Sequence, residues 1–206
     1  MQPYLQVSLN VRGRTCVVVG GGPEAEERVV RLIEAQARVV VVAEALTEPL
    51  ARWASQGRIE HRARGFEGTD LEGAFLVLVV GRDAAWQDRI FEQAQARGVL
   101  VYAQDRPESS HLAMPALVRR GLLRMAISTD EASPALAGQL RGQLERLFDE
   151  PFVRYILWLD ELRTQLKDSE PDPERRAERL RAAVEGFSIH GLIHYPEAYR
   201  NRSTST

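Results

Sequence analysis

The chain has 206 residues, 44% of them hydrophobic, and a formal net charge of −2. This length and composition predict one large domain, or a main domain with appendages, around a real hydrophobic core. The near-neutral charge excludes a general nucleic-acid binder. The single cysteine, Cys16, excludes an internal disulfide framework and a cysteine-based metal site.

The sequence offers no sign of export or of membrane insertion. No apolar stretch approaches the roughly 18 residues of a membrane span. The first residues also lack a basic start followed by a long apolar run. We therefore expect a soluble, cytoplasmic protein.

The first elements in chain order are a short edge strand at 4–9 and a buried strand at 15–19, which runs into three glycines and a helix at 24–36. A strand, a tight glycine turn and a helix start together form the usual site for a dinucleotide pyrophosphate. The phosphates would meet unpaired N–H groups at the positive end of the helix dipole. The candidate cofactor residues here are Gly20, which allows the turn, Gly21, Gly22, where the backbone must approach the phosphates, and Ala25, which lets the helix pack closely on the strand.

A second β-branched run, at 39–43, ends in an acid. Glu44 follows Gly22 by 22 positions, close to where a ribose-binding acid is expected, roughly 20 residues on. This spacing strengthens the prediction of a dinucleotide site. The alternative is a doubly wound sheet whose glycine turn holds no ligand.

Strands and helices continue to alternate up to residue 103. The predicted elements are a helix at 46–56, a strand at 59–63, a strand at 75–80, a helix at 86–97 and a strand at 99–103. This alternation predicts an α/β fold, with a Rossmann-like parallel sheet and right-handed crossovers.

The pattern changes after Asp105. We expect a loop at 106–114, then a hairpin from 117–118 and 122–128 that adds antiparallel strands to the parallel sheet. Helices are expected at 134–148, 153–167 and 173–184. The first of them carries an apolar stripe that suits either a partner subunit or the protein's own sheet.

Ligands of open parallel sheets bind beyond the carboxyl ends of the strands. Three predicted points lie there: the glycine turn, the segment from Gly81 to Asp83, and Gln104 with Asp105. Asp105 could accept a proton while a hydride leaves for nicotinamide. The alternative is an aspartate that only caps a loop.

Several short motifs follow one another in an order that resembles a known family. They are Val-Val-Val-Gly20-Gly21-Gly22 with Ala25, Val-Val-Val-Ala43, Asp105-Arg106-Pro107-Glu108, Met114-Pro115-Ala116, Ile127-Ser128-Thr129 and Ser133-Pro134-Ala135-Leu136-Ala137. This order resembles the precorrin-2 dehydrogenases of siroheme synthesis, including the amino-terminal module of siroheme synthase, over roughly residues 3–150.

The resemblance implies NAD-dependent oxidation of the tetrapyrrole precorrin-2 to sirohydrochlorin, with Fe²⁺ insertion in several members, by a homodimer. It implies an NAD-binding Rossmann domain at 1–112, a small α+β dimerisation region at 113–149 and a helical C-terminal domain at 150–206. Asp105 takes the place of the family's catalytic aspartate. The family's cofactor contacts correspond to Gly22, Pro23, Glu24, Glu44 and Ala45, beside the further candidates Gly81 and Asp83.

The chain departs from the family pattern at Val80-Gly81-Arg82, Tyr102, Leu112 and Asp130-Glu131. These departures motivate a second hypothesis, a catalytically degenerate module that binds nucleotide or tetrapyrrole without turnover. A preference for NADP is a third reading, which Glu44 opposes because an acid there would repel a 2′-phosphate.

A substrate rich in carboxylates calls for guanidinium groups, which bind carboxylate as a fork. The candidates are Arg106, Arg119 and Arg120, and His111 as a proton carrier or a contact for the inserted metal; a solvated surface is the alternative for each. His190 and His194 would share a face only if the tail is helical there. No resident metal site is predicted.

Overall fold

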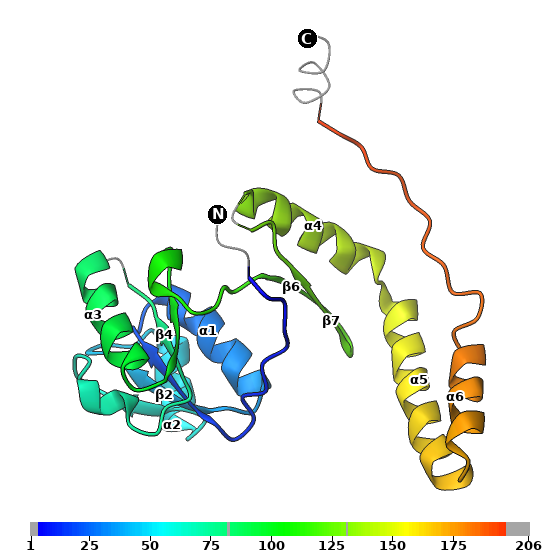
Figure 1. Ribbon diagram of the computed structural model, residues 1–206, viewed down its shortest axis with the longest axis horizontal. Helices are drawn as coiled ribbons and strands as arrows, with labels where there is room; N and C mark the ends of the chain where they lie inside the picture. The colour runs from blue at the N-terminus through cyan, green and yellow to red at the C-terminus, as the bar shows by residue number, and fades with distance from the viewer. Residues whose placement is uncertain (1–3, 82, 131, 197–206) are drawn as a thin grey trace. The chain divides into compact units, whose positions relative to one another are not determined.

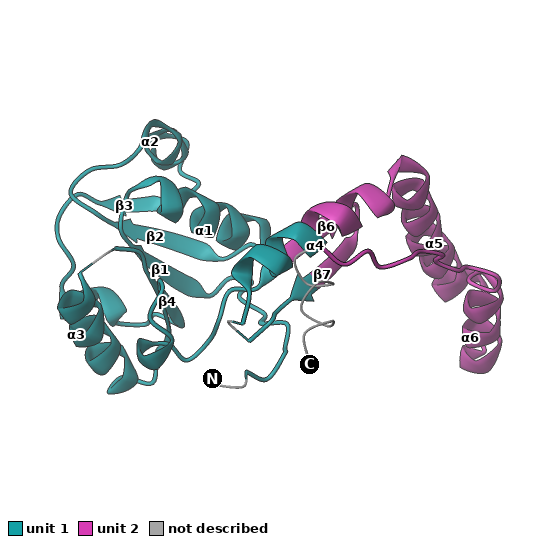
Figure 2. Cartoon of the chain, turned by 90° about the horizontal axis from the view of Figure 1, so that it is seen from above, with its two compact units in different colours: residues 1–116, 126–140 teal, residues 117–125, 141–206 magenta. Residues whose placement is uncertain are grey.

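The computed structural model describes residues 4–81, 83–130 and 132–196. The chain divides into two compact units, residues 1–116 with 126–140 and residues 117–125 with 141–206 (Figure 2). The departures at Arg82 and Glu131 lie outside the described residues.

A five-stranded parallel sheet forms the centre of the first unit (Figure 1). Its strands are β1 (Thr15–Val19), β2 (Arg38–Val42), β3 (Glu60–Arg62), β4 (Leu76–Val79) and β5 (Leu100–Ala103), in the order β3-β2-β1-β4-β5. Cys16 pairs with Val39 on one side and with Leu76 on the other. The strand order therefore reverses between β1 and β4, and ligands of doubly wound sheets bind at such a switch point.

Helices cover both faces of this sheet, which is why its inner strands are apolar throughout. Helices α1 (Pro23–Glu34) and α2 (Glu48–Ser55) cover one face and α3 (Ala84–Gln95) covers the other. The first core includes Val18, Val41 and Leu50, and the second includes Val19 and Ile90. The predicted Rossmann-like α/β fold is confirmed.

The only cysteine lies in the middle of this sheet. Cys16 is fully buried in β1, and burial raises the pKa of its thiol to about 11. Its thiol therefore stays protonated and serves as a small apolar group, as its position in an apolar strand predicts.

A buried carboxylate joins the 3₁₀ turn before β4 to the edge strand β3 and the residues after it. Asp70, in the 3₁₀ turn η1 (Gly68–Leu71), accepts hydrogen bonds from Arg62 at 2.7 Å and from Arg64 at 2.7 and 2.8 Å. The backbone N–H of Glu67 donates a further bond at 2.9 Å. Burial on its own raises the pKa of Asp70, but these bonds outweigh it and lower the pKa from 3.8 to about 2.

Two sequence predictions about strands are wrong. Residues 4–9 form no strand, because Leu5, Val7 and Leu9 all point to solvent and bury nothing against the sheet. The predicted hairpin does form, from β6 (Ala116–Arg120) and β7 (Leu123–Ile127), but as a separate two-stranded sheet. It is not an antiparallel addition to the parallel sheet.

The two units share β6, β7 and α4 (Pro134–Leu147), and the second unit adds α5 (Glu150–Ser169) and α6 (Pro173–Ala182). Asp149 and Asp172 cap the starts of α5 and α6 by accepting backbone N–H groups. The Tyr155 hydroxyl of α5 donates to the Ala183 carbonyl at 2.9 Å, just beyond α6. The division into domains at 112 and 149 stays a prediction.

The segment 187–194 is not helical. His190 and His194 therefore do not share a helical face, and the condition for their ligand spacing is not met. Within the described residues, no helix is both long and apolar enough to cross a membrane.

Candidate functional site

The glycine turn after β1 is pressed between two other segments. Gly20 has φ +129, and a Cβ there would collide with the carbonyl oxygen of Val80, the residue after β4. A Cβ on Gly21 would collide with the carbonyl oxygen of Ala45, and the Thr47 N–H donates to the Gly21 carbonyl at 3.0 Å. Both positions require glycine because backbone already fills the space of a side chain.

The third glycine has more room. Gly22 is the N-cap of α1, where no side chain caps the helix, and Pro23 begins the first turn. A Cβ on Gly22 would meet nothing closer than a Glu24 carboxylate oxygen at 3.5 Å. Ala25 is fully buried against the sheet. The start of α1 is thus open to an anion, as a dinucleotide pyrophosphate requires.

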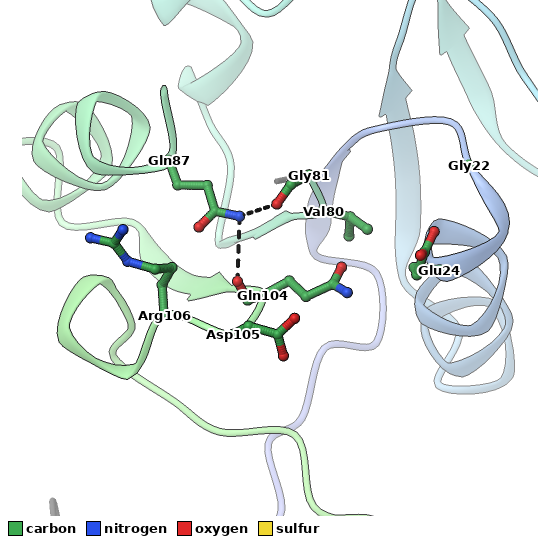
Figure 3. Close-up of a pocket in the computed structure, with 8 residues that line it drawn as sticks. All are labelled: Gly22, Glu24, Val80, Gly81, Gln87, Gln104, Asp105 and Arg106. Carbon is green, nitrogen blue, oxygen red and sulfur yellow. Dashed lines mark hydrogen bonds between the residues drawn. The ribbon is translucent and has the colours of Figure 1, made fainter. Parts of the chain in front are cut away.

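A pocket of about 460 Å³ lies beside this turn, at the switch point of the sheet (Figure 3). It is lined by Gly22, Glu24, Val80, Gly81, Gln87, Gln104, Asp105 and Arg106. The structure therefore brings together the three segments that the sequence places at the strand ends.

Asp105 lies two residues beyond the end of β5 and lines this pocket. Its backbone has φ +58, in the left-handed region, which aspartate tolerates better than most residues. Its side chain is exposed and points into the open part of the pocket (Figure 3). A carboxylate in this position can exchange protons with water and with a bound molecule.

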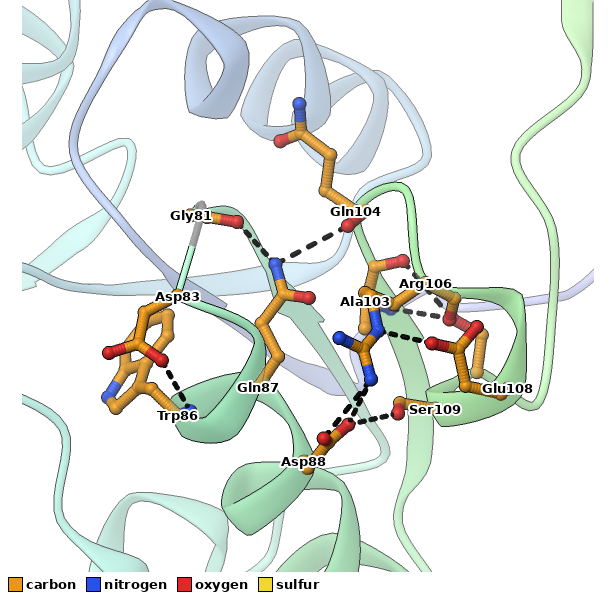
Figure 4. A network of polar contacts seen from close by, with 11 residues as sticks. Gly81, Asp83, Trp86, Gln87, Asp88, Ala103, Gln104, Arg106, Glu108 and Ser109 are labelled. Carbon is orange, nitrogen blue, oxygen red and sulfur yellow. Dashed lines mark hydrogen bonds and ion pairs between the residues drawn. The ribbon is translucent and has the colours of Figure 1, made fainter.

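Arg106 lines the same pocket, but its guanidinium is already paired. It contacts Asp88 at 3.0 Å and also forms an ion pair with Glu108 (Figure 4). The two carboxylates offset its positive charge, so Arg106 supplies less net charge to a ligand than its sequence position suggests.

The other predicted cofactor residues lie around the turn. Glu44 is exposed two residues beyond the end of β2, and Ala45 follows it with its carbonyl against Gly21. Neither lines the 460 Å³ pocket. Asp83 is the N-cap of α3 and accepts the Trp86 N–H at 3.0 Å, so its carboxylate already has a structural use.

The prediction that His111 faces the crevice is wrong. Its Nδ1 accepts the Val101 N–H at 3.2 Å and its backbone N–H donates to the Val101 carbonyl at 2.8 Å. Its ring packs on Phe91 of α3, with centroids 5.0 Å apart. The loop after β5 runs back along the edge of that strand. There the imidazole and the backbone N–H of His111 form hydrogen bonds with the backbone N–H and carbonyl of Val101.

Arg119 and Arg120 lie on β6. Arg120 Nε donates to the Phe148 carbonyl at 2.6 Å, so part of its guanidinium holds its own unit together. Their predicted contact with substrate stays a prediction. In the described parts of the chain, no group of three or more His, Cys, Asp or Glu residues is arranged to hold a metal ion.

Sequence reasoning missed Gln87 and Asp88. Gln87 is 1% exposed and lies on the buried face of α3 with Ile90 and Ala94. The sequence could have indicated Gln87, because its amide lies on the apolar face of an amphipathic helix and a buried polar group needs hydrogen-bond partners. Those partners lie in the loops after β4 and β5.

A family model described as "Putative NAD(P)-binding" matches residues 7–116. The chain belongs to this family. A nicotinamide dinucleotide, the cofactor expected from the glycine turn, is thereby confirmed.

Similar proteins extend over most of the chain. A siroheme synthase of Nitrosococcus oceani is 35% identical over 164 residues, which are 80% of this chain and 35% of that protein. Siroheme synthase 1 of Halorhodospira halophila is 32% identical over 197 residues, 95% of this chain and 41% of that protein. The chain thus spans about two fifths of the length of these curated relatives.

One solved structure matches over nearly its whole length. "SirC, precorrin-2 dehydrogenase" superposes with a TM-score of 0.78 at 27% sequence identity, covering 89% of this chain and 90% of that one. The resemblance to the precorrin-2 dehydrogenase module of siroheme synthesis is confirmed.

Proposed function

We propose that this protein oxidises precorrin-2 to sirohydrochlorin with NAD⁺. The observation that carries the proposal is the shared pocket: the glycine turn at the start of α1 and the carboxylate of Asp105 line the same cavity. The similarity to a precorrin-2 dehydrogenase over 90% of that protein's length supports this choice of substrate.

The nucleotide would be held by the segments around the sheet's switch point. The glycine turn and the first turn of α1, from Gly20 to Ala25, would surround the pyrophosphate, and the backbone N–H groups of Gly22 and Glu24 would be its donors. Pro23 has no N–H, and the N–H groups of Gly20 and Ala25 already donate to the carbonyls of Val42 and Gly22. Glu44, with Ala45, would bind the adenosine ribose, because an acid just after β2 accepts hydrogen bonds from ribose hydroxyls. Gly81 and Asp83 would line the nicotinamide side.

Bound NAD⁺ supplies a hydride acceptor. Oxidation of the macrocycle removes two hydrogens, one as a hydride and one as a proton, so the residues of the chain must take up only the proton. Asp105 would accept it, and because its side chain is exposed it can release the proton to water. The products are then sirohydrochlorin, NADH and a proton.

The substrate's carboxylates would be met by arginines. Arg106 would contribute from the pocket, and the contacts of Arg119 and Arg120 with substrate stay predictions from the sequence. The family resemblance further supports a homodimer, a cytoplasmic location and Fe²⁺ insertion into sirohydrochlorin, with Fe²⁺ as a substrate of the protein.

The test is a spectrophotometric assay of the purified chain with precorrin-2, adding NAD⁺ and then Fe²⁺. We expect NADH to appear with precorrin-2 and NAD⁺ alone, and siroheme to form only after iron is added. Absence of NADH formation in the wild-type protein would overturn the dehydrogenase proposal.

A catalytically degenerate binding module is the second candidate, because Val80 and Gly81, which depart from the family pattern, line the pocket. Titration of NAD⁺ and of sirohydrochlorin separately distinguishes the two functions. Tight binding of either ligand without any turnover of precorrin-2 would favour the binding module.

A further inference from the structure

Two consecutive residues near the start of α3 reach the loop that carries Asp105 (Figure 4). Gln87 contacts the residue before Asp105, and Asp88 contacts the residue after it. Neither belongs to the glycine turn or to the predicted acid–base chemistry.

Gln87 joins the ends of two strands. Its Nε2 donates to the carbonyl of Gly81, after β4, and to the carbonyl of Gln104 at 3.3 Å, after β5. Carbonyl oxygens only accept hydrogen bonds, so the amide nitrogen must face them. The side chain is buried, and a replacement without N–H groups would leave the two carbonyls without this donor.

Asp88 holds the other side of the loop. Its carboxylate accepts two bonds from Arg106 Nη2, at 3.0 and 3.1 Å, and one from the Ser109 hydroxyl at 2.5 Å. Ser109 is itself buried. The contacts of Asp88 therefore fix the chain immediately after Asp105.

Between these two anchors the backbone of Asp105 has φ +58. A non-glycine residue in the left-handed region costs free energy, and it persists only where its surroundings hold it. Gln87 and Asp88 supply such restraints on both sides.

We propose that Gln87 is a positioning residue for the dehydrogenation, which sets the distance between the nicotinamide side of the crevice and Asp105. The proposal rests on the proposed function. Gly81 lies on the proposed cofactor side of the crevice, and Gln104 directly precedes Asp105, the proposed proton acceptor. The single amide of Gln87 therefore links the backbone on the cofactor side to the backbone that carries Asp105. Misplacement of a catalytic group by about 1 Å can cost about 100-fold in rate.

The informative variant is Gln87→Glu, which keeps the shape of the side chain. Ionised, the new carboxylate has no proton to donate and faces two carbonyl oxygens; protonated, it can donate one hydrogen bond. Burial and the neighbouring carboxylates of Glu24, Asp88 and Asp105 raise its pKa, whereas Arg106 opposes this. The defect should therefore be larger at pH 8 than at pH 6.

We expect kcat of Gln87→Glu to fall about 30- to 100-fold relative to wild type at pH 8, and the variant-to-wild-type ratio to recover at least about 5-fold at pH 6. The Kd for NAD⁺, measured without substrate, should change less than about 3-fold, because the glycine turn is untouched. Gln87→Met, which has no donor at any pH, should show the loss without the recovery. Gln95→Glu, an exposed change on the same helix, is the matched control and should behave as wild type.

Hydrogen exchange on the same proteins gives a readout that does not depend on activity. The backbone N–H groups of Arg106, Ser109 and Ser110 are bonded within the loop. They should exchange faster in Gln87→Glu at pH 8, after correction for the intrinsic rate, and recover protection at pH 6.

The outcomes separate the two proposals. An active wild type with a Gln87→Glu variant that keeps its kcat, or loses it equally at both pH values, would overturn the positioning role alone. A wild type that does not oxidise precorrin-2 would overturn the proposed function, and the positioning role with it. The exchange data would still show whether Gln87 holds the loop.

Discussion

The guanidinium of Arg28, on α1, donates a hydrogen bond to the hydroxyl of Tyr102 at 3.1 Å, and its carbon lies 5.1 Å from the centre of the tyrosine ring. Tyr102 lies on β5, three residues before Asp105. Its side chain packs with the core under α1 and does not line the pocket. Tyr102, which departs from the family pattern, therefore contributes to the packing of α1 on the sheet.

We expect Tyr102→Phe to lower the free energy of unfolding by about 1 kcal/mol, the usual net value of one hydrogen bond. The affinity for NAD⁺ should stay within about 2-fold of wild type, because the ring and its packing remain. Chemical denaturation and NAD⁺ titration measure the two quantities. A large loss of NAD⁺ binding without loss of stability would show that the hydroxyl serves the site.

Replacement of Asp105 separates chemistry from backbone conformation. Asp105→Asn should lower kcat by about 10²- to 10⁴-fold, the usual contribution of a general base, with little change in NAD⁺ affinity. Its stability should match wild type, because asparagine also tolerates a positive φ. Asp105→Ala should lose in addition about 1 kcal/mol of stability. Asp160→Asn, an exposed change on α5, is the control for charge.

Glycine replacements should affect folding and binding differently. Gly21→Ala places a methyl group against the Ala45 carbonyl and should lower the melting temperature by several degrees, the usual effect of a steric clash costing about 1–3 kcal/mol. Gly22→Ala meets only the flexible Glu24 side chain and should fold normally. It should nevertheless weaken NAD⁺ binding, because the methyl group occupies the approach to the phosphates. Equal affinity of Gly22→Ala and wild type would place the pyrophosphate elsewhere.

Glu44 is predicted to select NAD⁺ over NADP⁺. Removing its charge in Glu44→Gln should raise the ratio of kcat/KM for NADP⁺ to that for NAD⁺ by about 10-fold, or roughly 1.4 kcal/mol, since a carboxylate there repels a 2′-phosphate. Glu48→Gln, a nearby exposed change in the first turn of α2, should leave the ratio unaltered. An unchanged ratio in Glu44→Gln would remove Glu44 from the ribose site.

The Asp70 carboxylate makes stability depend on pH at the acid end. Its folded pKa, about 2, lies below the ordinary value of 3.8, so the stabilisation is complete above pH 4 and is lost as the pH falls towards 2. The difference in unfolding free energy between wild type and Asp70→Asn should therefore shrink by about 2 kcal/mol between pH 6 and pH 2. Denaturant unfolding at several pH values measures it, and a constant difference would contradict the assignment.

The sheet was predictable because its strands carry their own signal. The runs at 16–19, 39–43 and 75–80 are apolar without interruption, and each is followed by a helix or a turn. The segment 4–9 also has a strand-like pattern, with apolar and polar residues alternating, yet it forms no strand, since pairing is decided by the tertiary structure. The hairpin was placed correctly along the chain, but local turn chemistry does not say which sheet it joins.

At the site, the sequence located the groups at the strand ends, because in a parallel sheet those ends lie at one edge. It misplaced His111, whose position depends on how the loop after β5 folds back along that strand. It missed Gln87, because the carbonyls that the amide bonds are backbone atoms, and every residue has one. The positive φ of Asp105 likewise was not predicted, and it lies between two contacts with α3, at Gln104 and Arg106, that no local pattern encodes.

The burial of Cys16 has a practical consequence. The chain has one sulfhydryl, enclosed in β1, the central strand of the sheet, and held protonated. An alkylating reagent reaches it only when the strands around it separate, so the labelling rate reports the opening of the nucleotide-binding sheet alone and ignores fraying of α5 and α6. The protein thus carries an intrinsic probe for how strongly a dinucleotide holds that sheet closed, without any engineered label.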